Sequence, residues 1–233
     1  MTYFERATYG LDRRLDLTYW LFFTPLVTGG LTRCTTLGAI GLLTTLVPRP
    51  TLELGILTEL MIALVVADFV GYWSHRLRHS VVLWRFHAIH HSPTKLDALA
   101  AARMHPVDDV IDNTLVGAVL FAAGFSTETV FAIGPILFLH IALTHADVDW
   151  NFGLFRRILV SPSHHRAHHE IGAAQNYAGM FSFIDVLFGT YREPSGGPHG
   201  SGESIPESLR AHLAWPLRVS DAMAHPSDAV RQS

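Results

Sequence analysis

A series of long apolar stretches constrains the fold of this chain more than any other feature. They cover residues 17–31, 37–47, 54–73, 114–123 and 130–143. A helix that crosses the hydrocarbon core of a bilayer needs ~20 mostly apolar residues, and residues 54–73 have that length despite Glu59 and Asp68. With 49% hydrophobic and 16% charged residues, the chain is too apolar for an ordinary soluble domain. The sequence therefore predicts an integral membrane protein.

The number of crossings depends on how the other stretches are interrupted. Residues 17–47 are predicted to form one long broken helix or two short ones, because Thr24-Pro25 and Gly29-Gly30 interrupt them. Residues 114–143 predict a helical hairpin that turns near residues 124–128. We expect an all-α membrane protein with three to four transmembrane helices.

The first helix of this hairpin is expected to begin before its apolar part. Pro106 suits the first position of a helix, and Asp108 and Asp109 suit a first turn. His105 precedes them, and a capping or substrate-side role is expected for it. The first sixteen residues are charged and lack a short apolar core with a cleavage site, so no cleavable signal peptide is expected.

Basic residues indicate the orientation of the chain. They lie between two apolar blocks or after the last one, at Arg76, Arg78, Arg85, Lys95, Arg103, Arg156, Arg157 and Arg166. The positive-inside rule predicts that this side faces the cytoplasm. A formal net charge of −3 and the absence of a basic run argue against nucleic-acid binding.

Histidines are the candidate metal ligands. Twelve of the fifteen lie between His75 and His169, and their spacing puts several imidazoles on one face of a helix in each of three groups. Neutral imidazole is the commonest protein metal ligand, and eight such ligands exceed what one ion binds, so two ions are implied. The three groups are His75 and His79; His87, His90 and His91; and His165, His168 and His169.

A ninth ligand is expected near the end of the hairpin. His140 and His145 both lie there, but five residues apart they point in different directions on a helix, and we favour His145. His164 pairs with His168 at i, i+4, yet only His165 reproduces the spacing of the earlier triplet. We expect His164 to lie behind the ligands or in solvent.

A pH-sensing surface and a metal-transport path are the alternative interpretations of these histidines. A transporter would place its ligands near the middle of the bilayer on broken helices. Each histidine group here follows the end of an apolar stretch, which predicts a site at the membrane surface.

Three segments resemble the histidine boxes of the fatty acid hydroxylase and sterol desaturase superfamily of membrane di-iron enzymes. They are DFVGYWSHRLRH at 68–79, WRFHAIHHS at 84–92 and SPSHHRAHH at 161–169. The segments NYAG at 176–179 and DVLFGTY at 185–191 are similar to the usual end of the family, with Ala178 where glycine is common.

The resemblance implies a small helical membrane bundle beneath a cytoplasmic helical cap that holds two iron ions, which zinc can replace in purified samples. It implies O2-dependent hydroxylation of a fatty acyl, sterol-like or related lipid. Desaturation on the same scaffold and a metal-binding membrane protein without turnover are the alternatives. The implied ligands are His75, His79, His87, His90, His91, His145, His165, His168 and His169.

Four further residues are expected to support these ligands: Asp68, His164, Asn176 and Asp185. The ring nitrogen that is not on a metal needs an acceptor. Asp68 is expected either to orient a histidine of a neighbouring helix or to form a hydrogen bond between helices.

The chain lacks a flavin or nicotinamide glycine fingerprint, a thiolate cluster and a cytochrome-like segment; its one cysteine is Cys34. A separate ferredoxin- or cytochrome-type electron donor is therefore expected to dock on the basic face. Residues 1–191 are expected to form a single membrane-embedded domain of this family. Residues 192–233 are expected to form a polar, partly mobile tail with one short helix near 206–215 and no chemistry.

Overall fold

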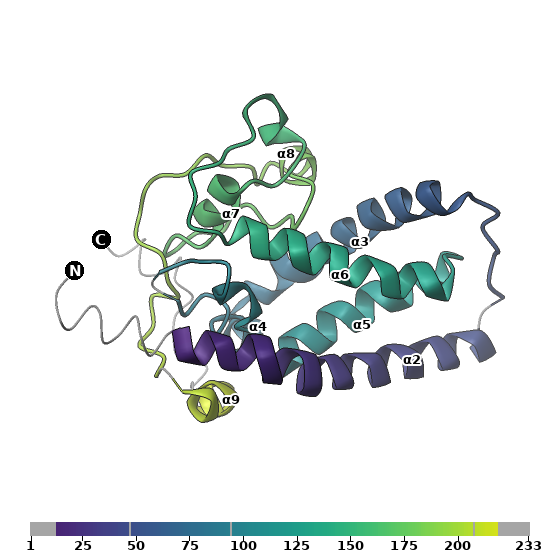
Figure 1. Ribbon diagram of the computed structural model, residues 1–233, viewed down its shortest axis with the longest axis horizontal. Helices are drawn as coiled ribbons and strands as arrows, with labels where there is room; N and C mark the ends of the chain where they lie inside the picture. Colours follow the sequence, from purple (N-terminus) through teal and green to yellow (C-terminus); the bar gives the residue numbers. More distant parts are fainter. Residues whose placement is uncertain (1–12, 47, 94, 207, 219–233) are drawn as a thin grey trace.

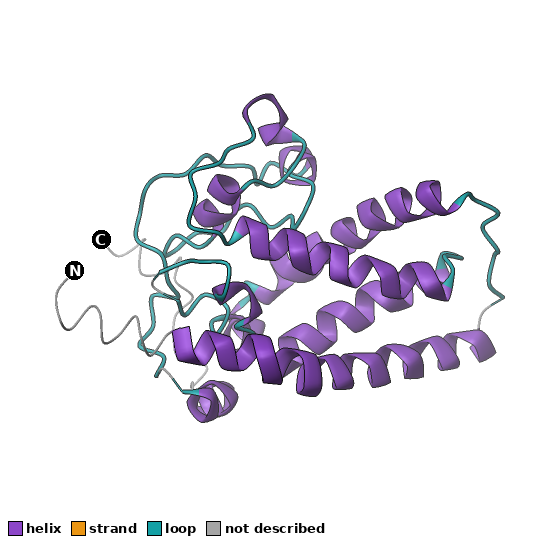
Figure 2. Ribbon diagram, viewed as in Figure 1, coloured by secondary structure: helices purple, strands orange, loops and turns teal. Residues whose placement is uncertain are grey.

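The computed structural model describes residues 13–46, 48–93, 95–206 and 208–218. Within them the fold consists of helices and loops, without a strand (Figure 2). The predictions for residues 1–12 and for the end of the tail, 219–233, lie outside the described residues.

Four long helices form an antiparallel bundle and alternate in direction along the chain (Figure 1). The first is continuous from Arg13 to Leu46 and contains a π-helical segment. The bounds are η1 Tyr19–Thr28, α2 Gly29–Leu46, α3 Ile56–Arg78, α5 Pro106–Ala122 and α6 Thr127–Thr144.

Of the two predictions for the first helix, the structure has the single long one. Pro25 lies inside it and cannot donate a backbone hydrogen bond. The wider π-helical turns carry the chain past this residue, and the N–H of Gly29 bonds to the carbonyl of Thr24, five residues back. The interruption therefore changes the hydrogen-bond pattern instead of ending the helix.

The predicted hairpin of α5 and α6 is confirmed. Its first helix begins at Pro106, and the side chain of His105 caps it by accepting the N–H of Val107 at 3.2 Å. The turn contains Gly124 at φ 100°, where a Cβ atom would lie 2.7 Å from the carbonyl oxygen of Pro50. Glycine is required there by both conformation and space.

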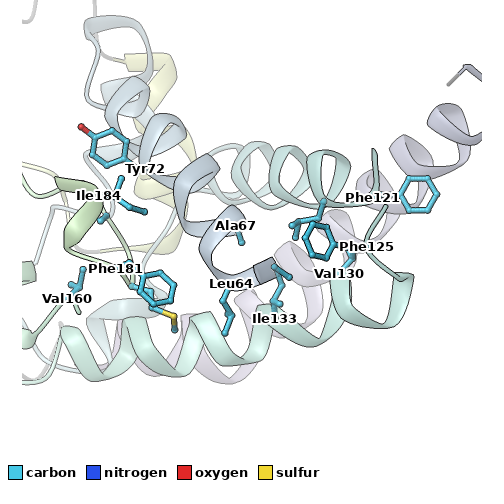
Figure 3. Close-up of a cluster of buried hydrophobic side chains, with 14 of the residues drawn as sticks. Leu64, Ala67, Tyr72, Phe121, Phe125, Val130, Ile133, Val160, Phe181 and Ile184 are labelled. Atoms are coloured by element: carbon cyan, nitrogen blue, oxygen red, sulfur yellow. The ribbon is translucent and has the colours of Figure 1, made fainter. Parts of the chain in front are cut away.

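The bundle packs around a buried apolar cluster that extends into the loops beyond it (Figure 3). Side chains of α3, α5 and α6 form one part, including Leu64, Ala67, Leu120, Val130 and Ile133. Val160, Phe181 and Ile184 from the later loops belong to the same cluster. The segments that flank the third histidine group thus pack directly against α3.

Short helices gather at one end of the bundle (Figure 1). They are α4 Val81–His87, η2 Ala100–Ala102, η3 Gly153–Arg157, α7 Pro162–His168, α8 Phe183–Leu187 and α9 Leu209–Arg218. The predicted short helix of the tail corresponds to α9. The Nδ1 atom of His212 in α9 lies 3.1 Å from the hydroxyl oxygen of Tyr19. This contact docks α9 on the first helix.

In the part of the chain that the structure describes, three helices are long and apolar enough to cross a membrane: Arg13–Leu46, Ile56–Arg78 and Thr127–Thr144. Helix α5 has 17 residues and lies between them in the bundle. These helices support a membrane location. The exact number of crossings and the side that faces the cytoplasm stay predictions.

Candidate metal centre

The structure brings nine buried histidines together in two groups. Within each group, one ring nitrogen of every histidine lies within 4.8 Å of the others. The first group is His75, His79, His87, His91 and His168, and the second is His90, His145, His165 and His169. These are the nine histidines that the sequence proposed as ligands; their binding of metal stays a prediction.

Helix ends position most of these rings. His75 lies in the last turn of α3, with His79 directly after the helix, and His87 ends α4. His145 and His169 follow the last residues of α6 and α7. Rings at helix ends can converge from several directions, which side chains on a single helix face cannot do.

In five of the histidine rings, Nδ1 lies next to an oxygen atom. Four of these oxygens are backbone carbonyls, and the fifth belongs to a carboxylate. A carbonyl oxygen only accepts hydrogen bonds. These rings must therefore carry a proton on Nδ1, which leaves a lone pair on Nε2. The acceptors are Tyr177 for His75 (2.8 Å), Gln175 for His168 (2.7 Å), Arg103 for His90 (3.2 Å), Ile141 for His145 (2.8 Å) and the carboxylate of Asp108 for His87 (2.8 Å).

The unprotonated nitrogens face one another. The Nε2 atoms of His75 and His87 are 3.0 Å apart, although neither carries a proton to share. Burial lowers the pKa of His87, so a proton on this ring does not relieve the contact at neutral pH. Two lone pairs at this separation repel unless a cation lies between them.

The spacing fits one metal ion in each group. Nitrogen ligands about 2.1 Å from an ion and at right angles to each other are about 3.0 Å apart. The Nε2 atoms of His79 and His168 are 3.2 Å apart, and Nε2 of His165 lies 3.3 Å from that of His145 and 3.1 Å from that of His169. The donor set therefore suits two ions that accept imidazole nitrogen.

Asp108 is a functional candidate that the sequence reasoning missed. Its carboxylate is 2% exposed and accepts the Nδ1–H of His87, and the guanidinium of Arg78 lies 3.5 Å away. The sequence places Asp108 only in the first turn of its helix. Its partner is 21 residues away, and no local spacing relates the two positions.

Asp68 has different partners from those expected. It neither orients a histidine nor joins two helices through its described hydrogen bonds. Its carboxylate accepts the backbone N–H groups of Gly179, Met180 and Phe181 at 2.8, 3.0 and 2.6 Å. The reason is that an irregular segment, not a helix, packs against α3 at this position, and its N–H groups need acceptors.

Asp185 continues this arrangement along the same segment. It accepts the N–H of Tyr177 at 2.7 Å, that of Ala178 at 3.1 Å and Nε2 of His164 at 3.1 Å. Asn176 donates to the carbonyl of His164 at 3.1 Å. Since carbonyls of this segment accept from His75 and His168, Asp185 and Asn176 hold the backbone that positions these two rings.

The two uncertain histidines lie outside both groups. His140 is half-buried on α6 one turn before His145, and it does not join the cluster. His164 is buried next to Asp185, behind the rings, as expected. His145 lies in the second group and His140 does not; the choice of His145 as a ligand stays a prediction.

The family is shown by comparison with known proteins. A family model described as fatty acid hydroxylase matches residues 60–190. The chain belongs to this family. The match includes all three histidine boxes, the segment held by Asp68 and Asp185, and the closing segment up to Thr190.

Three curated relatives of this chain have names that refer to lipid oxidation. Ornithine lipid hydroxylase OlsE of Rhizobium tropici is 32% identical over 68% of this chain and 50% of its own length. A putative methylsterol monooxygenase of Dictyostelium discoideum is 30% identical over 61% and 54%. Human alkylglycerol monooxygenase is 33% identical over 55% and 29%. The chain spans about half the length of the first two, and no solved structure matches it significantly.

A cavity of about 190 Å³ lies beside the histidines of this hydroxylase-family chain. His75, His87, His90 and His165 line one end of it. Its walls come from α3, α5 and α6: Gly71, Val116, Gly134, Leu137, Phe138 and Ile141 are among them. A mostly apolar space thus connects the helical bundle to both groups of histidines.

Proposed function

We propose that this chain is a membrane oxygenase that holds two iron ions with its nine clustered histidines and uses O2 to hydroxylate a lipid. One observation carries the proposal: ring nitrogens of nine histidines converge in two buried groups at the spacing of ligands around single ions. The names of the relatives support lipid oxidation.

The bound ions would supply the electrons that reduce O2 and the oxidising power needed to break an unactivated C–H bond. The protein holds the rings in place. Carbonyls of Gln175, Tyr177 and Arg103 fix which nitrogen faces the ion. Nine nitrogens around two six-coordinate ions also leave positions open for oxygen.

The cavity is the proposed place for the lipid. Leu137, Phe138 and Ile141 of α6 form an apolar wall, whereas Asp112 and Asn113 of α5 form a polar one. An acyl chain or ring system between α5 and α6 would bring a carbon atom to the histidine end. Holding that carbon in one position is what selects the atom that is oxidised.

The reaction also needs an electron donor and a defined side of the membrane. We propose a separate ferredoxin- or cytochrome-type donor, and a metal centre on the cytoplasmic side as the basic loops predict. Residues 1–191 form the catalytic membrane domain in this proposal, with residues 192–233 as its tail.

The test combines metal analysis with lipid analysis. The purified chain is expected to contain about two iron ions and to consume O2 with a reductant and lipid. Because zinc binds imidazole more tightly than ferrous iron does, zinc-bound preparations are reconstituted with iron first. Lipids of a host with and without the chain are then compared for a mass gain of one oxygen.

The outcomes separate the alternatives. A loss of two hydrogens identifies a desaturase. Bound metal without O2 consumption indicates a metal-binding protein without turnover. His168→Ala is expected to lose iron and activity while staying in the membrane, and His140→Ala, a histidine outside both groups, serves as the matched control. Unchanged activity of His168→Ala would refute the assignment of the third box.

A further inference from the structure

Two short helices near the metal centre expose apolar side chains that the proposed site does not use. On η3, Leu154 is 96% exposed and Phe155 is 59% exposed. On α8, Leu187 is 69% exposed, and its neighbours Phe183 and Val186 are also exposed. We call these five residues the η3–α8 surface. Isolated exposed apolar residues are normal, but a contiguous group indicates an interaction.

The two helices lie side by side although about thirty residues separate them. The hydroxyl of Ser182, directly before α8, donates to the carbonyl of Arg156 in η3 at 2.9 Å. The N–H of Val160 donates to the carbonyl of Met180 at 2.8 Å. These contacts place η3 and α8 next to each other beside the end of the bundle, where Figure 1 shows α8.

The depth of this surface follows from its contacts with α3. Phe188, directly after α8, packs on Tyr72 and Trp73 with ring centroids 5.2 and 4.9 Å apart. These residues lie five and six positions before Arg78, the end of α3. At ~1.5 Å per residue that is about 8–9 Å along the helix axis from its end. The end of α8 thus lies alongside this candidate span, not beyond its last residue.

The face of α3 that Phe188 packs against is also exposed, as expected of a face that contacts lipid. Phe69 and Trp73 are exposed on this candidate span, and Phe188 contacts both. The η3–α8 surface is therefore continuous with the lipid-facing side of the bundle. Figure 3 shows Val160, Phe181 and Ile184 from these segments in one cluster with Leu64 and Tyr72 of α3.

Hydrogen bonding supports an irregular segment at this depth. Non-helical backbone within the bilayer is tolerated only where its polar groups are satisfied inside the protein. Asp68, ten residues before the end of α3, accepts three consecutive N–H groups of residues 179–181. This explains an acidic residue in an otherwise apolar span.

Charge adds an indication of the partner. Arg156 and Arg157 are exposed next to the apolar residues of η3. Arg156 lies 3.3 Å from Glu193, and the guanidinium of Arg157 lies 5.7 Å from the ring centre of Tyr191. Apolar side chains flanked by arginines are typical of segments at the lipid headgroup boundary.

We infer that the η3–α8 surface is inserted into the membrane interface, with Leu154, Phe155 and Leu187 among the acyl chains and the two arginines at the lipid phosphates. The segment that carries the third histidine box is then anchored in the bilayer on both sides. This inference needs no turnover, so it stands or fails independently of the proposed oxygenase function.

Depth-dependent quenching tests the inference on the full chain. Cys34 is the only cysteine, so Cys34→Ser provides a background for single cysteines that carry a fluorescent label. Leu154→Cys and Leu187→Cys report on the surface. Leu139→Cys, exposed on α6 five residues before its end, is the lipid-facing reference, and Ser204→Cys, exposed in a polar loop, is the aqueous reference.

The labelled proteins are reconstituted in phosphatidylcholine and phosphatidylglycerol vesicles with and without brominated acyl chains. The fluorescence lost by the labels at 154 and 187 is expected to exceed half of that lost by the label at 139. The label at 204 is expected to lose little. Leu154 makes few contacts, so its replacement leaves folding intact, and position 187 provides an independent measurement. Quenching at both positions equal to that at 204 would overturn the inference and assign the surface to a protein partner.

Discussion

Replacing Asp108 is expected to weaken metal binding. We expect a loss of about tenfold in Asp108→Asn and of about 100-fold in Asp108→Ala. The carboxylate accepts the Nδ1–H of His87 at 2.8 Å, and both side chains are almost fully buried. The carboxylate of Asp108 thereby fixes the orientation of the His87 ring, whose Nε2 faces the other rings of the first group. Residues that support metal-bound histidines in this way typically affect affinity 10- to 100-fold.

The two magnitudes follow from the hydrogen bond. A bond to a charged group contributes about 1.5–3 kcal/mol, against about 0.5–1.5 kcal/mol for a neutral one. The amide of Asp108→Asn can still accept from His87, so the loss is roughly the difference, about 1–1.5 kcal/mol. Asp108→Ala loses the whole bond and leaves the Nδ1–H unpaired. At about 1.4 kcal/mol per tenfold change, these losses give the two factors.

The assay is a titration of metal-free protein in detergent with Co²⁺ or Fe²⁺ against a competing chelator. Asp109→Asn is the matched control, because Asp109 is the next residue and accepts from Asn113 on the same helix at 2.6 Å. It is expected to leave the dissociation constant within about twofold. The reasoning is refuted if Asp108→Ala also stays within that range, or if Asp109→Asn weakens binding equally.

Three further predictions concern His145, Asp185 and the docking of α9. His145→Ala is expected to reduce the metal content from about two ions to about one per chain, with His140→Ala unchanged, as checked by elemental analysis. Asp185→Ala leaves several buried donors unpaired at about 1–3 kcal/mol each, and should lower the thermal unfolding temperature in detergent measurably. Burial lowers the pKa of His212 to about 3, so the folded state favours its neutral form, and docking of α9 weakens as the pH falls from 6.5. At pH 5 the loss is about 2 kcal/mol, measurable as lower hydrogen-exchange protection factors in residues 209–218 after correction for the intrinsic exchange rate at each pH, and His212→Gln should remove this pH dependence.

Much of the candidate centre could be predicted because its residues recur at helical spacing. Positions i, i+3 and i+4 share a helix face whatever the tertiary structure, so the triplets at His87 and His165 were recognisable locally. The start of α5 at Pro106 and the turn at Gly124 were predictable for the same reason. Each depends on residues only a few positions apart.

The supporting contacts could not be predicted because they join distant segments. Asp108 meets His87 only when α5 packs beside the short helix that follows α3. The carbonyls of Gln175 and Tyr177 carry no side-chain signal at all. The role of Asp68 was also unpredictable, since its three backbone partners lie 111 to 113 residues away, and an acid in an apolar span suggests a side-chain partner first.

The arrangement of the two groups explains why two histidine boxes are triplets and one is a pair. In the second box, His87 and His91 join the first group and His90 joins the second. In the third box the assignment is reversed, because His168 joins the first group and its two companions, at i and i+4, join the second.

Each triplet therefore contributes its i, i+4 pair to one group and its i+3 ring to the other. The pair of His75 and His79 lacks an i+3 histidine, and both its rings join one group. The second group then needs a ligand from elsewhere, which is the position that His145 occupies. On this reasoning, any displacement of α4 or α7 moves rings of both groups together, so the two proposed metal positions would be coupled through two short helices and not through a shared side chain.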